Sequence, residues 1–147
     1  MSGGVKVIPV ETDVLVIGGG LAGCMAAIKA REECVRVTIA EKSNTVCSGQ
    51  AGSGIDHTWA YIPEVHGKMG WTIEDLVEDH VQGIGRGFSN RELLHFIARE
   101  SYARLLDLER FGLAIRYPDS SLPGKFRLVH QFHSVPTALN VDAGPIK

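Results

Sequence analysis

The run of fifteen uncharged residues from Val14 to Ile28, with three consecutive glycines inside it, constrains the fold of this chain most. A membrane-spanning helix needs roughly 20 apolar residues, so the run is too short for one. A secretory signal begins with a basic segment, whereas the residues before this run include the acids Glu11 and Asp13. Two interpretations remain. The glycines form either a tight turn between a buried strand and a packed helix, or a phosphate-binding G-x-G-x-x-G turn.

The surrounding pattern favours the phosphate-binding turn. An apolar strand is predicted at 14–17, the motif occupies 18–23, a helix is predicted over 21–33, and a second strand over 36–40. This order is a βαβ unit of the usual length of about 30 residues, which implies parallel strands with a helical crossover. The sequence therefore predicts an α/β fold whose first turn binds a dinucleotide.

The chemistry expected of such a turn has candidates in this sequence. The helix N-terminus at Leu21 and Ala22 would present backbone N–H groups and a positive dipole end to a pyrophosphate. Glu41 follows the second strand about 20 residues after the glycines, where an acid accepts hydrogen bonds from a ribose. Taken alone, Glu41 could equally be a solvated acid at a strand end.

Composition excludes several classes of partner. The 147 residues fit one domain, and 15 basic against 17 acidic residues give a net charge of −2, which indicates neither nucleic-acid binding nor attachment to an anionic membrane. Three unclustered cysteines indicate neither a disulfide framework nor a zinc site, and a reducing cytoplasm is expected. His130 and His133 form an isolated H-x-x-H pair without a third ligand nearby, so no metal is expected.

A second glycine-rich segment, 48–54, lies inside a stretch of altered composition. Residues 43–70 are rich in Ser, Gly, Asn, Pro and His and lack a helical or strand period, which predicts a long ordered loop. Loops of that length are usually functional. A nicotinamide-binding unit would usually continue into another helix and strand, so the second glycine segment favours a longer ligand contact and disfavours an NAD-dependent dehydrogenase.

The second half of the chain predicts helices followed by short strands. Thr72 with Asp75, and Ser89 with Glu92, are spaced like capping boxes that open two helices within 72–112. Gly112 follows the second helix where a C′ glycine belongs. Residues 113–147 are consistent with short strands.

Together, the first strand, the glycine turn, the Glu41–Lys42 pair and the S-G-x-x-x-x-G segment resemble the N-terminal part of the succinate dehydrogenase/fumarate reductase flavoprotein family. Within that family the second segment looks most similar to the alpha subunit of adenylylsulfate reductase. The resemblance is strong over 12–56 and weaker over 72–113. It implies a Rossmann-like FAD-binding domain with a parallel sheet, and helices that lead toward a capping domain beginning in 113–147.

The resemblance also implies which residues contact FAD. Around the first turn and the second strand, the residues implied for the pyrophosphate and ribose are Gly18, Gly20, Ala22, Gly23, Glu41 and Lys42. In the second glycine segment, those implied along the cofactor and near its isoalloxazine ring are Ser48, Gly49, Gly52, Ser53 and Gly54. Leu21 joins them as a residue of the helix N-terminus. Members that attach FAD covalently carry His after the loop serine, and Gly49 stands there, so non-covalent FAD is expected.

Two further departures limit what the resemblance implies. The family usually has Gly before its second strand, where this chain has Glu33-Cys34-Val35. Members of the family run to several hundred residues, so we expect a truncated fold that needs self-association or a partner subunit, with an iron–sulfur protein as the electron partner that the resemblance suggests. No catalytic residue is assigned. The expected function is an FAD-dependent oxidoreductase or its fragment, and the alternative is a non-catalytic nucleotide-binding subunit of a split flavoprotein.

Overall fold

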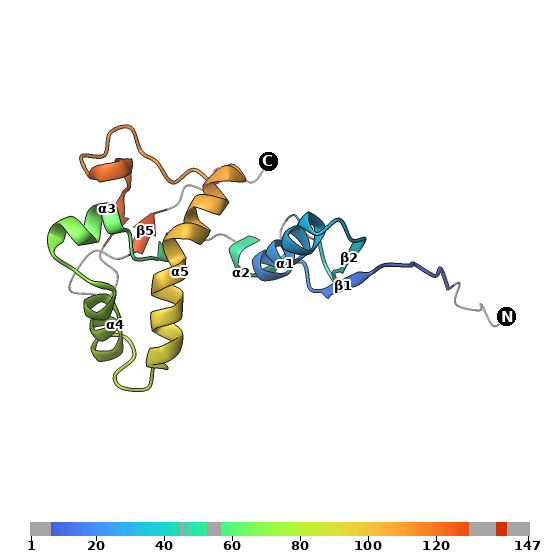
Figure 1. The fold of residues 1–147 in the computed structure, drawn as a ribbon, viewed down its shortest axis with the longest axis horizontal. Coiled ribbons are helices and arrows are strands. Elements are labelled where there is room, and N and C mark those ends of the chain that lie inside the picture. The colour runs from blue at the N-terminus through green and yellow to red at the C-terminus, as the bar shows by residue number, and fades with distance from the viewer. Residues whose placement is uncertain (1–6, 45, 47, 53–56, 130–137, 141–147) are drawn as a thin grey trace. The chain divides into compact units, whose positions relative to one another are not determined.

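The structure, a computed structural model, describes residues 7–44, 46, 48–52, 57–129 and 138–140. The chain divides into two compact units, Met1–Gly54 and Ile55–Lys147. Each unit has its own sheet (Figure 1).

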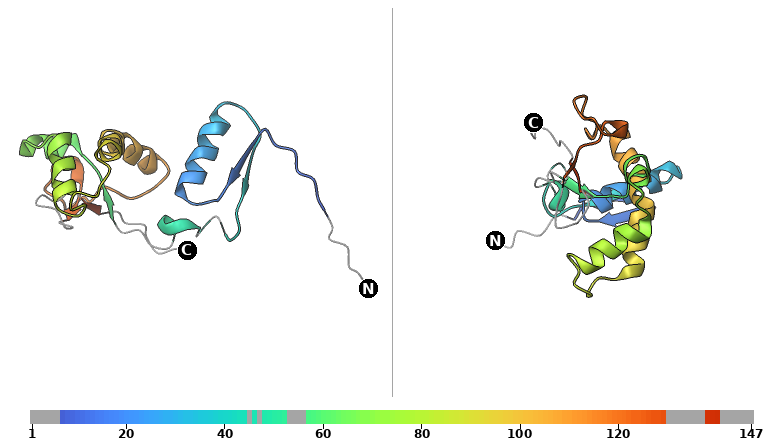
Figure 2. Two further views of the ribbon diagram at one scale, coloured as in Figure 1. Left: turned by 90° about the horizontal axis from the view of Figure 1, so that it is seen from below. Right: turned by 90° about the vertical axis from the view of Figure 1, so that its left-hand side faces the viewer.

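The first unit is the predicted βαβ arrangement. Strand β1 (Val14–Ile17) pairs in parallel with β2 (Val37–Ala40), with Val14 opposite Val37 and Ile17 opposite Ala40. Helix α1 (Leu21–Glu32) connects them and lies along both strands (Figure 2, left). The observed helix ends one residue before the predicted end, and the second strand begins one residue later than predicted. The α/β class and the parallel pairing are confirmed.

Strand alternation decides which face of this sheet α1 covers. Val14 and Val16 are partly buried, whereas Leu15 and Ile17 are 55% and 84% exposed. Ala27 is the buried residue of α1. Successive strand residues point to opposite faces, so one face packs against the helix and the other presents aliphatic side chains to the surface.

An ion pair fixes the strand register at the end remote from the glycine turn. The Arg36 backbone N–H donates to the Asp13 carboxylate at 2.8 Å, and the Arg36 guanidinium donates to the same carboxylate at 3.0 and 3.1 Å. These bonds hold the pKa of Asp13 below its usual value. Because one carboxylate binds both backbone and side chain of the neighbouring strand, a register slip would break all three bonds.

The second unit combines helices with a small antiparallel sheet. Its strands β3 (His57–Trp59), β5 (Ala138–Asn140) and β4 (Leu128–Val129) pair in the order β3-β5-β4. Its helical segments are α3 (Pro63–His66), η1 (Gly67–Met69), α4 (Ile73–Gln82), α5 (Arg91–Arg110) and η2 (Pro123–Lys125).

Helices α4 and α5 pack against each other through Leu76, Val77, Val81 and Ala98 (Figure 1). Outside that apolar seam, Arg91 pairs with Glu74 and Glu78, and His95 lies 2.6 Å from Glu74. A second apolar cluster comprises Ala60, Ile62, Val65, Leu105, Ile115 and Phe126. None of the described helices is long and apolar enough to cross a membrane.

Three predicted elements differ from the structure. The stretch 43–70 is not one loop, because it contains α2 (Gly49–Gly52), β3, α3 and η1. Elements of three or four residues are too short to leave a period in the sequence. The N-cap of α5 is Asn90, whose side chain accepts from Leu93 N–H at 3.0 Å, rather than Ser89. The segment 113–117 contains no strand, although β4 and β5 lie in the region where short strands were expected.

The start of α4 confirms the predicted capping box and makes it testable. Thr72 Oγ1 accepts from Asp75 N–H at 3.2 Å, and the Asp75 carboxylate accepts from Thr72 N–H at 2.8 Å. Thr72→Ala removes the first bond and should lower the free energy of unfolding by about 1 kcal/mol, while Thr72→Ser should stay near wild type. Urea unfolding followed by tryptophan fluorescence reports this, because both tryptophans, Trp59 and Trp71, lie in the second unit. Equal losses in the two variants would contradict the cap.

Candidate functional site

The shape of the glycine turn depends on two glycines, one for its backbone conformation and one for the close approach that it allows. Gly18 has φ of +101°, and its N–H donates to the Ala40 carbonyl at 2.8 Å, at the carboxyl end of both strands. A Cβ at Gly23 would lie 1.9 Å from the Gly18 carbonyl oxygen and 3.4 Å from Val16 Cγ1. Helix α1 therefore approaches β1 this closely only because residue 23 is glycine.

Helix α1 begins directly after this turn with an open N-terminus. Its N-cap is Gly20, in an extended conformation with φ of −71° and ψ of −179°, and Gly20 has no side chain with which to cap the helix. No acidic residue lies in the first turn, whereas Lys29 and Arg31 lie in the last. The first N–H groups and the positive end of the helix dipole would therefore favour an anion at this position.

The second glycine segment meets the first at this point. A Cβ on Gly20 would lie 3.5 Å from Gly49 Cα. Gly49 has φ of +74°, and a Cβ there would lie 3.0 Å from Gly20 Cα and 4.0 Å from the Leu21 nitrogen. The start of α2 thus lies against the start of α1 with backbone facing backbone. A side chain at Gly49 would press against Gly20, whereas a methyl at Gly20 would make an ordinary contact. We call this meeting of the two segments the backbone cradle.

Glu41 connects both segments through one carboxylate. Its Oε2 accepts from Gly19 N–H at 2.5 Å and its Oε1 accepts from Ser43 N–H at 2.8 Å. Hydrogen bonds from Gly19 N–H, the Ser48 hydroxyl and Ser43 N–H hold the pKa of Glu41 below its usual value. The carboxylate is therefore ionised at neutral pH, and it faces the glycine turn rather than bulk solvent alone.

The structure brings most of the predicted site residues into one unit. Those that form the turn, the helix start, the strand end and the second segment are Gly18, Gly20, Leu21, Ala22, Gly23, Glu41, Ser48 and Gly49. Lys42 is exposed beside Glu41, and Gly52 is the last residue of α2. Ser53 and Gly54 lie outside the described residues.

The sequence did not predict three residues that contribute hydrogen bonds to the candidate site. Gly19 is buried and donates to Glu41, Ser43 donates through its backbone, and Cys24 Sγ–H donates to the Gly19 carbonyl at 3.3 Å. A sequence signal existed for Gly19, because the G-x-G-x-x-G pattern allows any residue at this position and the chain has glycine there. Nothing in the sequence marks the other two.

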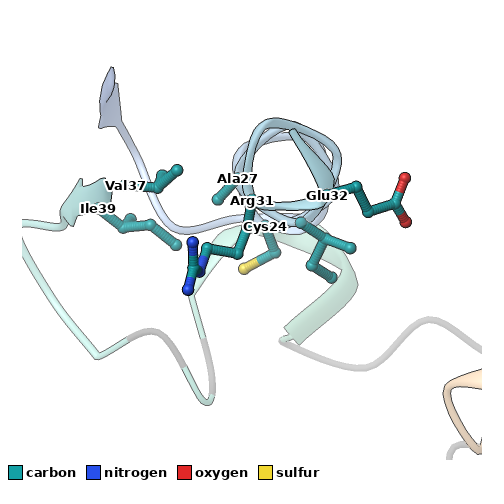
Figure 3. Close-up of a pocket in the computed structure, with 7 residues that line it drawn as sticks. Cys24, Ala27, Arg31, Glu32, Val37 and Ile39 are labelled. Carbon is teal, nitrogen blue, oxygen red and sulfur yellow. The ribbon is translucent and has the colours of Figure 1, made fainter. Parts of the chain in front are cut away.

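An apolar cavity of about 610 Å³ lies on the flank of this βαβ unit (Figure 3). Its lining comes from α1 and β2 and comprises Cys24, Ala27, Ile28, Arg31, Glu32, Val37 and Ile39. None of these is a predicted cofactor residue. The candidate site is therefore defined by the backbone cradle at the glycine turn and not by this cavity. In the described ranges, no three His, Cys, Asp or Glu residues gather as a metal site.

A parallel βαβ unit with its glycine turn at the carboxyl ends of the strands, and an acid after the second strand, defines a Rossmann-type dinucleotide-binding fold. The sequence profile of the FAD binding domain family matches residues 13–138, and the chain belongs to this family.

Individual relatives agree with this assignment. A fumarate reductase (CoM/CoB) subunit from Methanothermobacter marburgensis is 33% identical over 121 residues, which cover 76% of this chain and 20% of that protein. Adenylylsulfate reductase from Archaeoglobus fulgidus aligns structurally with a TM-score of 0.60 and 27% identity, covering 90% of this chain and 20% of the solved chain. A structure of adenosine-5-phosphosulfate reductase in complex with sulfite gives the same values.

These similarities confirm the family that the sequence pattern predicted, and they concern one part of its members. The chain spans about 20% of the length of the relatives that it matches. The cradle of Gly20 and Gly49 and the open N-terminus of α1 fit a dinucleotide such as FAD.

Gly23→Ala tests the contact that shapes the turn. The added methyl cannot be accommodated 1.9 Å from the Gly18 carbonyl oxygen, so α1 should shift. The free energy of unfolding of the first unit should fall by about 1–3 kcal/mol, although alanine is the better helix former. Hydrogen exchange of the β1 and β2 amides measures this loss. In Gly20→Ala the methyl makes an ordinary 3.5 Å contact. The free energy of unfolding should fall by at most about 1 kcal/mol, because alanine is a poorer N-cap than glycine. A Gly23→Ala variant as stable as wild type would contradict the close approach.

Proposed function

We propose that this chain binds FAD with the glycine turn and the α1 N-terminus at the pyrophosphate, and with Glu41 and Lys42 at the adenosine ribose. The second glycine segment, from Ser48 toward Gly54, would extend along the flavin half. The observation that carries the proposal is the approach of Gly49 to Gly20, because it joins the two segments into one backbone-lined cradle.

The ionised state of Glu41 suits a ribose contact. A carboxylate offers about four acceptor positions, and Gly19, Ser48, Ser43 and Lys42 all donate to that of Glu41. A ribose hydroxyl would therefore replace or share one of these donors. The pyrophosphate would instead meet the N–H groups at the start of α1, where no carboxylate of the first turn opposes it.

FAD supplies hydride and electron transfer when bound, and this chain's residues would bind and orient it. We propose that the chain acts in an oxidoreductase of the fumarate reductase or adenylylsulfate reductase type, on a dicarboxylate-like or sulfur-containing substrate. The names of its relatives support this class. No catalytic residue is assigned within the chain. The free cysteines Cys24 and Cys34 support a reducing cytoplasm as its location.

We further propose that FAD is held without a covalent bond. Gly49 stands where covalently flavinylated members of the family carry histidine, and it has no side chain to react. Acid precipitation of protein loaded with FAD should therefore leave all the flavin absorbance in the supernatant. Flavin fluorescence that stays with the denatured polypeptide on a gel would contradict this, and His57→Ala would then test the nearest described histidine.

A second candidate function is that of a nucleotide-binding component in a split flavoprotein, favoured by the exposed aliphatic face of the β1–β2 sheet. Parallel sheets are normally covered on both faces, yet Leu15 and Ile17 are exposed. The relative from Methanothermobacter is itself named as one subunit of its enzyme. We propose that a second copy or a partner, such as an iron–sulfur protein, completes the site.

The two candidate functions differ in a measurable way. For the subunit role, light scattering should show self-association of the pure chain, and Ile17→Ser should reduce it because the exposed aliphatic surface shrinks. Turnover of fumarate, succinate or adenylylsulfate should be absent until a partner is added. Turnover by a pure monomer would contradict the subunit role and favour an enzyme complete in this chain.

A further inference from the structure

We propose that Glu41 is a positioning residue that couples the two glycine segments before FAD arrives. Through Gly19 N–H it holds the first turn, and through the Ser48 hydroxyl it holds the start of α2. This inference rests on the proposed function, since the cradle that Glu41 would set is the one proposed to receive FAD.

The contacts come from three short segments, one of them distant in sequence, and meet at one carboxylate. Gly19 precedes Glu41 by 22 residues and donates to Oε2, while Ser43 follows it in the next turn and donates to Oε1. Ser48 adds its hydroxyl from the residue before α2. A carboxylate that accepts on both oxygens is fixed in orientation, so the three donor segments are fixed relative to one another.

The link from Glu41 to Ser48, which we call the tether, controls where the second glycine segment lies. The next residue is Gly49, whose backbone comes so close to Gly20 that a Cβ would lie 3.0 Å from Gly20 Cα. Holding the Ser48 side chain against Glu41 therefore sets how closely the second segment lies on the helix start. A cradle ordered in advance lowers the entropy lost on binding, which strengthens ligand affinity.

The tether requires a charged acceptor and not only a side chain of this size. A glutamine at position 41 would keep one oxygen and present an NH₂ group to a second donor, so it cannot satisfy Gly19 and Ser43 together. On the described segments that meet here, the other titratable side chains are Lys42, next to Glu41, and Cys24, which contacts the Gly19 carbonyl.

The first experiment tests the tether in the ligand-free chain by NMR. The amide protons of Gly19 and Ser43 should lie downfield and move together as pH falls through the pKa of Glu41, which is below the usual glutamate range. In Glu41→Gln both signals should lose that position and no longer titrate. Amides that do not titrate in wild type, or that keep their shifts in Glu41→Gln, would overturn the proposal.

The second experiment tests whether Ser48 acts through Glu41, using a double-mutant cycle on FAD affinity. Glu41→Gln and Ser48→Ala should each weaken binding roughly tenfold, and the double variant should be no weaker than Glu41→Gln alone. Glu33→Gln, a matched change at an exposed acid of the same unit, should bind like wild type. Strictly additive losses would show that the two residues act separately and would overturn the coupling.

The two readouts separate this inference from the proposed function. If wild-type protein binds no FAD, the proposed function fails, while the amide titration still decides whether the tether exists. If FAD binds but the amide shifts of Gly19 and Ser43 do not change with the protonation of Glu41, the tether is wrong and the proposed FAD site is retained. The amide signals of β1 and β2 in each variant show whether unit 1 remains folded, and Ser48→Ala, which removes only a hydroxyl, serves if Glu41→Gln does not fold.

Discussion

The close approach of Gly23 to the Gly18 carbonyl is the constraint on which the nucleotide-binding half of this chain depends. A Cβ at residue 23 would lie 1.9 Å from that oxygen, so α1 reaches its observed position on β1 only with glycine there. That position brings the start of α1 to the carboxyl ends of the strands, and it places Gly20 where Gly49 can approach it. The open helix N-terminus and the backbone cradle are both consequences of this one contact.

The sequence predicted the helices, strands and caps that depend on residues close together in the chain. The βαβ order was predictable because each strand is apolar and the glycines occupy fixed spacings between them. The cap at Thr72 and the C′ glycine after α5, Gly112 with φ of +98°, follow from side-chain and backbone chemistry within a few residues. The acid Glu41 was also identifiable, since its distance from the glycines is set by the length of the βαβ unit.

What the sequence could not predict depends on contacts between segments or on very short elements. Either Ser89 or Asn90 could cap α5, and only the backbone conformation, extended at Asn90, decides between them. The short elements within 43–70 leave no periodicity, so they were interpreted as a loop. The contact of Ser48 with Glu41 joins two turns that no local pattern relates, although each residue had been predicted at the site separately.

The central claim is that the βαβ unit recognises the ADP half of FAD, and ligand competition measured by calorimetry tests it most directly. FMN carries the flavin and one phosphate but lacks the AMP half of FAD, whereas ADP carries the adenosine and both phosphates without the flavin. We predict that ADP displaces FAD from this chain and that FMN does not, because the proposed contacts of the first turn, the α1 N-terminus and Glu41 are with the adenosine ribose and the pyrophosphate. Displacement of FAD by FMN, with no effect of ADP, would contradict this claim.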